Sequence, residues 1–297
     1  MDTPSSWPAL PLAAWRDTYA TLHMWMQVVG KLTLATTPLM NHWWNTAFHF
    51  TARGLATQPM RCGERTLVAQ FDFLSHELCL ECSSGAGMSI ELEPMTVADF
   101  YAKTMAALEE IACPMRIWTT PVEVADGIAF ERDTTHRSYD RARAAAFWRA
   151  LESMRPVFER FRCGFIGKSS PVHFFWGTFD LAVSRFSGRR APDRPEADAV
   201  TRESYSHELV SHGFWPGGGG VDEPVFYAYA APEPAGFAAT RVLPPAARYD
   251  AAFHEFFVPY EAVRTAKDPE AALTAFLEST YEAAARLGKW EREKLER

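Results

Sequence analysis

The chain has 297 residues, about twice the length of an ordinary domain, so the length predicts one large domain or two of usual size. Hydrophobic residues make up 47% and charged residues 23%, which excludes a disordered or low-complexity chain. A net charge of −7 argues against a basic nucleic-acid binder. No apolar run reaches the roughly 18 residues of a membrane span, so no membrane partner is expected.

The N-terminus and the cysteines indicate where the protein works. The first ten residues lack the basic segment and apolar run of a secretory signal, which predicts a cytoplasmic protein. Five cysteines cannot all pair, which favours reduced thiols. Cys79 and Cys82 form a CxxC pair inside an alternating run, where a three-residue step predicts opposite faces of a strand. With no second pair to complete a zinc set, no metal site is predicted.

Apolar spacing predicts four helices in chain order. They cover residues 11–29, a segment that begins at the capping pair Thr96 and Asp99, residues 147–158 with a kink at Pro156, and a segment from Asp268 to Gly288. Strands are predicted at 46–55, 66–73, 76–82, 88–93, 116–124, 172–186, 205–214, 225–230 and 255–263. Helices and strands are grouped rather than alternating. This grouping favours an α+β fold with mainly antiparallel sheet over a dinucleotide-binding α/β fold.

The two halves of the chain share short matches in the same order. The sequence Ser-His-Glu-Leu at 75–78 recurs at 206–209, a displacement of 131 residues. His42, followed by two aromatic residues, matches His173 at the same displacement, and Gly-Lys at 30–31 matches 167–168. Collinear matches at nearly one displacement indicate an internal duplication. We therefore predict two related units, 1–138 and 139–297, each an antiparallel sheet flanked by helices, either separate or fused as one compact body.

Three familiar motifs are present only in part. His207 and His212 are five residues apart, whereas a zinc-protease helix needs a spacing of about four. The Gly-Lys-Ser at 167–169 lacks the leading glycine of a phosphate-binding loop, because Arg162 occupies that position. The four glycines at 217–220 do not have dinucleotide-binding spacing. This glycine run predicts a strand connection or, alternatively, a mobile lid beside a ligand.

Residues suited to chemistry concentrate between Lys168 and Trp215. Asp180 lies within an aromatic strand pattern, where a buried carboxylate needs a partner. A cluster of arginines before a proline-rich stretch predicts an ordered loop that grips a carboxylate or phosphate, or else an exposed loop balanced by nearby acids. His207 and Glu208 are strand neighbours, so only one of them faces a given pocket, and a purely structural role for each stays open.

These residues lead to two functional hypotheses. The first is a small-molecule enzyme or binding protein that takes an anionic ligand in the second unit. The predicted catalytic residues are His173 or His207 as general base, with Asp180 or Glu208 as the balancing carboxylate. The predicted ligand contacts are Lys168, Arg185, Arg189 and Arg190 for the anion, with Trp176 and Trp215 as apolar walls. The second hypothesis is a non-catalytic interaction module that uses the same arginines and aromatics.

Some properties stay open at this stage. A metal held by His173, His207 and a carboxylate is a further alternative within the first hypothesis. Neither the cofactor nor the oligomeric state follows from the residues.

Several longer runs resemble one bacterial family. They are TYATLHMW, NHWW, TARGL, IGKSSPVHFFWG, FDLAVSRFSGRRAP, SYSHELVSHGFWPGG and FLESTYEAA. Together they resemble the family catalogued as domain of unknown function 5996, from Trp7 to about Trp290. The resemblance implies a complete bacterial cytosolic protein. It brings with it no activity, cofactor or site residue.

Overall fold

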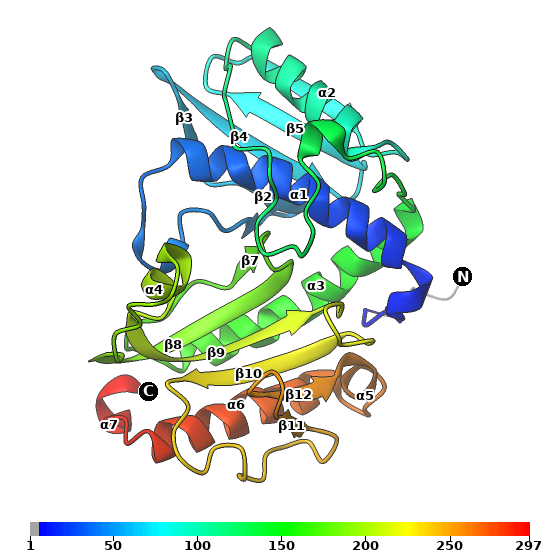
Figure 1. Ribbon diagram of the computed structural model, residues 1–297. Helices are drawn as coiled ribbons and strands as arrows, with labels where there is room; N and C mark the ends of the chain where they lie inside the picture. The colour runs from blue at the N-terminus through cyan, green and yellow to red at the C-terminus, as the bar shows by residue number, and fades with distance from the viewer. Residues whose placement is uncertain (1–5) are drawn as a thin grey trace.

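The computed structural model describes residues 6–297. Its fold is α+β, as predicted, with two antiparallel sheets of six strands each. In Figure 1 the N-terminal sheet lies above the long helix α1 (Arg16–Thr36) and the C-terminal sheet lies below it. No helix within 6–297 is long and apolar enough to cross a membrane. The prediction that no secretory signal is present rests partly on residues 1–5, which lie outside the described range.

The N-terminal sheet has the strand order β1-β2-β4-β5-β6, with β3 paired to β4. Its strands are β1 (His49–Phe50), β2 (Gly54–Ala56), β3 (Met60–Cys62), β4 (Arg65–Asp72), β5 (Glu77–Cys82) and β6 (Gly87–Glu91). Within β5, Cys82 is buried in the core while Cys79 lies half-buried on the opposite face. The predicted separation of these two thiols is therefore confirmed.

The C-terminal sheet has the strand order β11-β12-β10-β9-β8-β7. Its strands are β7 (His173–Phe175), β8 (Asp180–Arg190), β9 (His207–Trp215), β10 (Val225–Ala231), β11 (Arg248–Asp250) and β12 (Glu255–Pro259). The predicted strand 172–186 is thus two strands joined by a turn. The prediction of a loop is wrong for Arg189 and Arg190, because β8 continues to Arg190 and pairs there with β9.

Most helix ends follow the capping signals in the sequence. The Thr96 hydroxyl accepts a hydrogen bond from Asp99 N–H, and the Asp268 carboxylate accepts one from Ala271 N–H. The remaining helices are α2 (Val97–Glu110), α3 (Arg141–Cys163), α4 (Ala199–Ser204), α5 (Tyr260–Arg264), α6 (Pro269–Leu287) and α7 (Arg292–Leu295), with short 3₁₀ turns η1 (Leu12–Ala14), η2 (Asn41–Trp43) and η3 (Phe130–Arg132). The first helix begins later than predicted because η1 precedes it.

The predicted strand at 116–124 is irregular chain. The reason is visible at Val122, whose backbone N–H donates to the Gln27 side-chain oxygen while its carbonyl accepts from the Gln27 amide nitrogen. A side chain of α1 thereby satisfies the two backbone groups that a neighbouring strand would otherwise satisfy. A residue pattern typical of strands therefore does not produce a strand where a helix side chain satisfies the backbone hydrogen bonds.

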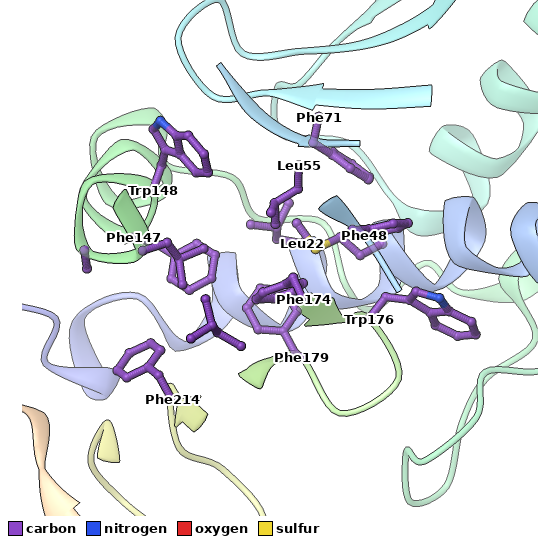
Figure 2. Close-up of a cluster of buried hydrophobic side chains, with 14 of the residues drawn as sticks. Leu22, Phe48, Leu55, Phe71, Phe147, Trp148, Phe174, Trp176, Phe179 and Phe214 are labelled. Atoms are coloured by element: carbon purple, nitrogen blue, oxygen red, sulfur yellow. The ribbon is translucent and has the colours of Figure 1, made fainter. Parts of the chain in front are cut away.

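One hydrophobic core joins the two halves. Figure 2 shows Leu22 of α1 among aromatic side chains of both sheets, including Phe48, Phe174 and Phe214. Phe48 and Phe174 also exchange backbone hydrogen bonds of 2.8 and 3.0 Å between the sheets. The two sheets therefore share one core around α1, and the backbone bridge between Phe48 and Phe174 joins them directly. The boundary at 138/139 and the duplication stay predictions.

Candidate functional site

One face of the C-terminal sheet carries a row of hydroxyl and carboxyl groups. Its other face packs against α3 and α6, as the 3.0 Å contact between His212 Nε2 and Thr280 Oγ1 marks. Because strand residues alternate between faces, and because the register aligns Ser184 with Ser211 and Ser211 with Tyr229, a second set points away from these helices. We call this set the tyrosine face; it consists of Asp180, Ser184, Ser211, Tyr227, Tyr229 and Glu255.

Asp180 and Tyr227 form the first polar pair of the tyrosine face. The Asp180 carboxylate accepts hydrogen bonds from the hydroxyls of Tyr227 and Thr178. Burial raises the pKa of Asp180, although these hydroxyls act in the opposite direction. Gly213 makes the pairing possible, because a Cβ there would lie 2.3 Å from Tyr227 Cζ. The Tyr227 ring therefore reaches Asp180 by crossing β9 at Gly213, where no side chain is in the way.

A second group of hydroxyls lies along the tyrosine face, and the charge of Glu255 acts on its members Tyr205 and Tyr229. The Tyr205 hydroxyl donates to the Tyr229 hydroxyl over 3.2 Å, and Ser184 donates to Ser211 over 3.0 Å. Glu255 is half-buried, and burial raises its pKa to about 8, with the charge of Asp180 adding to the rise. A large share of Glu255 is therefore protonated at neutral pH. A neutral carboxyl beside tyrosine hydroxyls is suited to general-acid chemistry.

Another carboxylate approaches this face from the loop after α2. The Glu123 side chain is exposed, yet desolvation raises its pKa, with smaller contributions from Asp180 and Asp198. Asp198 caps the N-terminus of α4. The carboxylates of Asp180 and Asp198, from two other segments of the chain, thus help to raise the pKa of Glu123. Perturbed pKa values of this kind are typical of functional sites.

Basic groups gather at the other end of β8 and β9. Lys168 Nζ lies 2.7 Å from His42 Nε2 and 4.9 Å from the centroid of the Phe186 ring. The His42 and His207 rings are 5.8 Å apart. Desolvation lowers the pKa of His207, and Lys168 and Arg190 lower it further. We call Lys168, His42 and His207 the basic end of the tyrosine face.

The orientation of His42 is determined by α4. Its backbone N–H donates to the Glu203 carboxylate over 2.9 Å, and its ring Nδ1 lies 3.1 Å from the Glu203 carbonyl oxygen. If Nδ1 carries the proton, Nε2 offers a lone pair to Lys168. His42 and Trp43 both adopt left-handed backbone angles, with φ of 58° and 60°. Two consecutive non-glycine residues in this region carry strain that the surrounding contacts must offset.

His173 lies deeper than the basic end. It is 1% exposed, and burial lowers its pKa to about 3. Its ring packs 5.1 Å from that of His49, and within 6–297 its buried Nδ1 has no hydrogen-bond partner. The imidazole is therefore neutral at physiological pH and is a weak base where it stands.

The three predicted arginine contacts are not brought together. Arg185 is on the helix-covered face, where its guanidinium stacks 3.4 Å over the Phe161 ring and donates to the Phe161 carbonyl oxygen. Arg189 pairs with Glu208 and donates to the Gly288 carbonyl oxygen after α6. Arg190 is exposed and lies opposite His207 in the β8–β9 register. Alternation alone would put Arg185 and Arg189 on one face of β8, and the irregular pairing between Phe186 and Arg190 separates them.

The two predicted tryptophan walls are also apart. Trp176 is 5% exposed and donates its indole N–H to the Thr46 carbonyl oxygen over 2.8 Å, with Gly30 directly against the ring. Trp215 is half-buried, and its ring lies 6.1 Å from that of Phe253. Of the predicted site residues, the structure groups Lys168, Arg190 and His207 at one end and Asp180 farther along β8.

Sequence reasoning missed the tyrosines, Glu255 and His42. The alternating tyrosines of VFYAYA were a usable signal, because residues 227 and 229 share one face of a strand. In the sequence, His42 stands out only as a match to His173. Its place beside Lys168 depends on contacts between η2 and α4, which are 161 residues apart in the chain.

A concave region lies away from the tyrosine face, at the starts of α2 and α3. It is an open pocket of about 560 Å³, lined by Thr96, Arg137, Tyr139, Asp140 and neighbours. Its polar groups already serve the fold, because Thr96 and Asp140 cap the two helices and the Tyr139 hydroxyl bonds His76. Within 6–297, no group of three or more His, Cys, Asp or Glu side chains is arranged to hold a metal ion.

The comparisons with known proteins agree with the resemblance noted above. No curated protein and no solved structure matches the chain. The model of a family of unknown function, DUF5996, matches residues 7–297. That match includes both sheets, every helix from α1 to α7, the tyrosine face and its basic end. The chain therefore belongs to the DUF5996 family of unknown function.

Proposed function

We propose that the protein binds an anionic small molecule on the tyrosine face and acts on it by acid–base chemistry. The observation that carries this proposal is the placement of Glu255 beside the Tyr205–Tyr229 and Asp180–Tyr227 pairs. In this assignment Glu255 donates the proton, and the tyrosine hydroxyls hold the oxygen that receives it.

The basic end supports an anionic group on the ligand. Lys168 is half-buried over aromatic rings and next to His42, so its ammonium is held in one place. A carboxylate or phosphate there would gain charge-assisted hydrogen bonds from Lys168 and from His207 when the latter is protonated. Arg190, exposed nearby, would add to the positive potential.

The strand geometry limits the size of the ligand. The Phe186 N–H donates to the Lys168 carbonyl oxygen over 3.0 Å, and Phe186 is two residues beyond Ser184 on the same face of β8. Two strand residues span about 7 Å. Glu255 is on β12, three inter-strand spacings of about 4.8 Å from β8, so a ligand with its anion at Lys168 and its reacting oxygen near Glu255 must also extend roughly 14 Å across the sheet. The five free thiols support a cytoplasmic location. The net charge of −7 argues against nucleic acid as a partner.

Ligand-induced stabilisation tests this proposal. Purified protein is screened by thermal shift against small carboxylates, phosphates and uncharged analogues, because a ligand of the native state raises Tm. We expect anionic members to stabilise the wild type, and we expect Lys168→Met and Glu255→Gln to weaken binding at least about 10-fold. Lys103→Met on α2 is the matched control, since Lys103 is an exposed lysine paired with Glu93.

Two outcomes would contradict the proposal. One is an anionic ligand that stabilises Lys168→Met and Glu255→Gln as strongly as the wild type. The other is a loss of binding in Lys103→Met equal to that in the two site variants, because that loss would point to a general effect of surface charge.

A further inference from the structure

Three of the five cysteines meet at one corner of the N-terminal sheet. Cys62 ends β3, Cys82 ends β5, and Cys113 follows α2. The Sγ atoms of Cys82 and Cys113 are 3.6 Å apart, and the Cys62 thiol also contacts that of Cys113. We call these three residues the thiol corner. The other two cysteines lie elsewhere, one on the far face of β5 and one exposed at the end of α3.

The members of the thiol corner differ in reactivity. Hydrogen bonds from the backbone N–H and the hydroxyl of Ser84 lower the pKa of Cys82. Burial raises the pKa of Cys113 to about 12, and contacts with the other two thiols add to the rise. The thiolate is the nucleophilic form of cysteine, so Cys82 reacts first and Cys113 second. Cys82 also adjoins the exposed turn between β5 and β6, whereas Cys113 is fully buried.

We propose that Cys82 and Cys113 form a reversible disulfide when the protein meets hydrogen peroxide. The Cys82 thiolate attacks one peroxide oxygen, the O–O bond breaks, and the departing hydroxide takes up a proton to leave as water. The resulting Cys82 sulfenic acid is attacked by the Cys113 sulfur. The S–O bond then breaks, and the Cys113 proton leaves with the hydroxyl as a second water. Two thiols are oxidised by two electrons, and one peroxide is reduced.

The new bond would change the N-terminal sheet locally. It would tie the end of β5 to the segment after α2 and close a loop between residues 31 apart. Closing a loop removes conformations from the unfolded chain, so the oxidised protein should melt at a higher temperature. The bond requires the sulfur atoms to approach from 3.6 Å to about 2.05 Å, a small movement for side chains at a sheet corner.

The experiment measures thiols and their linkage. Protein treated with hydrogen peroxide is denatured, and its remaining thiols are counted and alkylated. We expect the count to fall from five to three and dithiothreitol to restore it. Trypsin followed by a glutamate-specific protease separates Cys79 from Cys82, because Glu81 lies between them. Mass spectrometry should then find the Cys82 and Cys113 peptides joined.

Variants separate this disulfide from general oxidation. The double variant Cys79→Ala/Cys163→Ala should still form the link, and Cys62→Ala should also form it. Cys113→Ala and Cys82→Ala should form no link and show no reversible rise in Tm, with circular dichroism confirming that they fold. Equal thiol loss in Cys113→Ala, a link that involves Cys79 or Cys163, or a Cys82 sulfinic acid beside an alkylated Cys113 would overturn the proposal.

Discussion

Each of the two sheets buries an aspartate at one end of a long strand, and the pKa of the two aspartates is shifted in opposite directions. Asp72 accepts hydrogen bonds from the Arg53 guanidinium and from the backbone N–H groups of Leu74 and Ser75. Although burial acts to raise it, these partners hold the pKa of Asp72 below its usual value. Asp180 has hydroxyl partners instead, and burial raises its pKa. The first carboxylate fixes a turn, whereas the second is held by hydroxyl groups of the tyrosine face and a neighbouring threonine.

The repeated Ser-His-Glu-Leu sequence shows the same divergence. In the N-terminal sheet, His76 lies in a turn with φ of 58°, and its ring bonds the Tyr139 hydroxyl over 2.8 Å. In the C-terminal sheet, His207 lies in β9 beside Lys168. Identical local sequence therefore serves the fold in one sheet and lines the basic end in the other. We expect substitutions in the two sheets to differ accordingly.

The largest difference should come from glycine. A Cβ at Gly213 would lie 2.2 Å from the Leu181 carbonyl oxygen and would collide with Tyr227, whereas a Cβ at Gly87 in β6 would approach the Leu80 oxygen only to 3.1 Å. We expect Gly213→Ala to lower the free energy of unfolding by about 3 kcal/mol and Gly87→Ala by less than about 1 kcal/mol. Urea denaturation measures both. Equal losses would show that Gly213 is not needed for Tyr227 to reach Asp180.

The aspartates themselves should differ next. At pH 7, Asp72→Asn should lower the free energy of unfolding by about 2 kcal/mol, because the substitution removes a charged acceptor from two backbone N–H groups. Asp180→Asn should cost less than about 1 kcal/mol, since an amide can still pair with hydroxyl groups. Thermal and urea denaturation of both variants test this order. The reverse order would remove the contrast on which the proposed chemistry rests.

The pH dependence of stability should come mainly from the C-terminal sheet. The pKa of Glu255 is raised to about 8 in the folded state, so the native protein holds a proton that the unfolded chain releases near pH 4.5. This contribution to stability is full below about pH 4.5 and is lost as the pH rises towards 8. Glu255→Gln should lack this slope and be more stable than the wild type at pH 8 by on the order of 1 kcal/mol. An unchanged slope would place the titration elsewhere.

The smallest effects should come from the repeated glutamates. Glu208 pairs with Arg189, whereas Glu77 accepts only a 3.3 Å hydrogen bond from Ser89. Because both side chains reach solvent, Glu208→Gln should cost about 0.5 kcal/mol and Glu77→Gln close to nothing. High salt should remove the difference, which unfolding at two ionic strengths would show. A difference that survives high salt would point instead to the 2.9 Å hydrogen bond that Glu208 accepts from the Ser187 hydroxyl.

Local patterns predicted much of the fold and part of the site. The caps at Thr96 and Asp268 and the alternation in β5 and β9 depend on neighbouring residues, so the sequence was sufficient for them. The side-chain chemistry of Lys168 and His207 predicts both as site residues, and the structure brings them together. The sequence predicts that this strand ends at Phe186 and that Arg189 and Arg190 lie in a loop, because nothing local shows that β8 continues to Arg190 and pairs with β9.

The sequence by itself determined the α+β class, the main helices and the concentration of reactive side chains in the second half. Only the tertiary structure decided which side chains share a face, because the 131-residue matches do not say which strands pair or which face the helices cover. Desolvation raises the pKa of Glu255, and Lys168 lies against His42 through contacts between distant segments. Burial and long-range contact depend on the whole fold, and they give these residues the properties that our proposal uses.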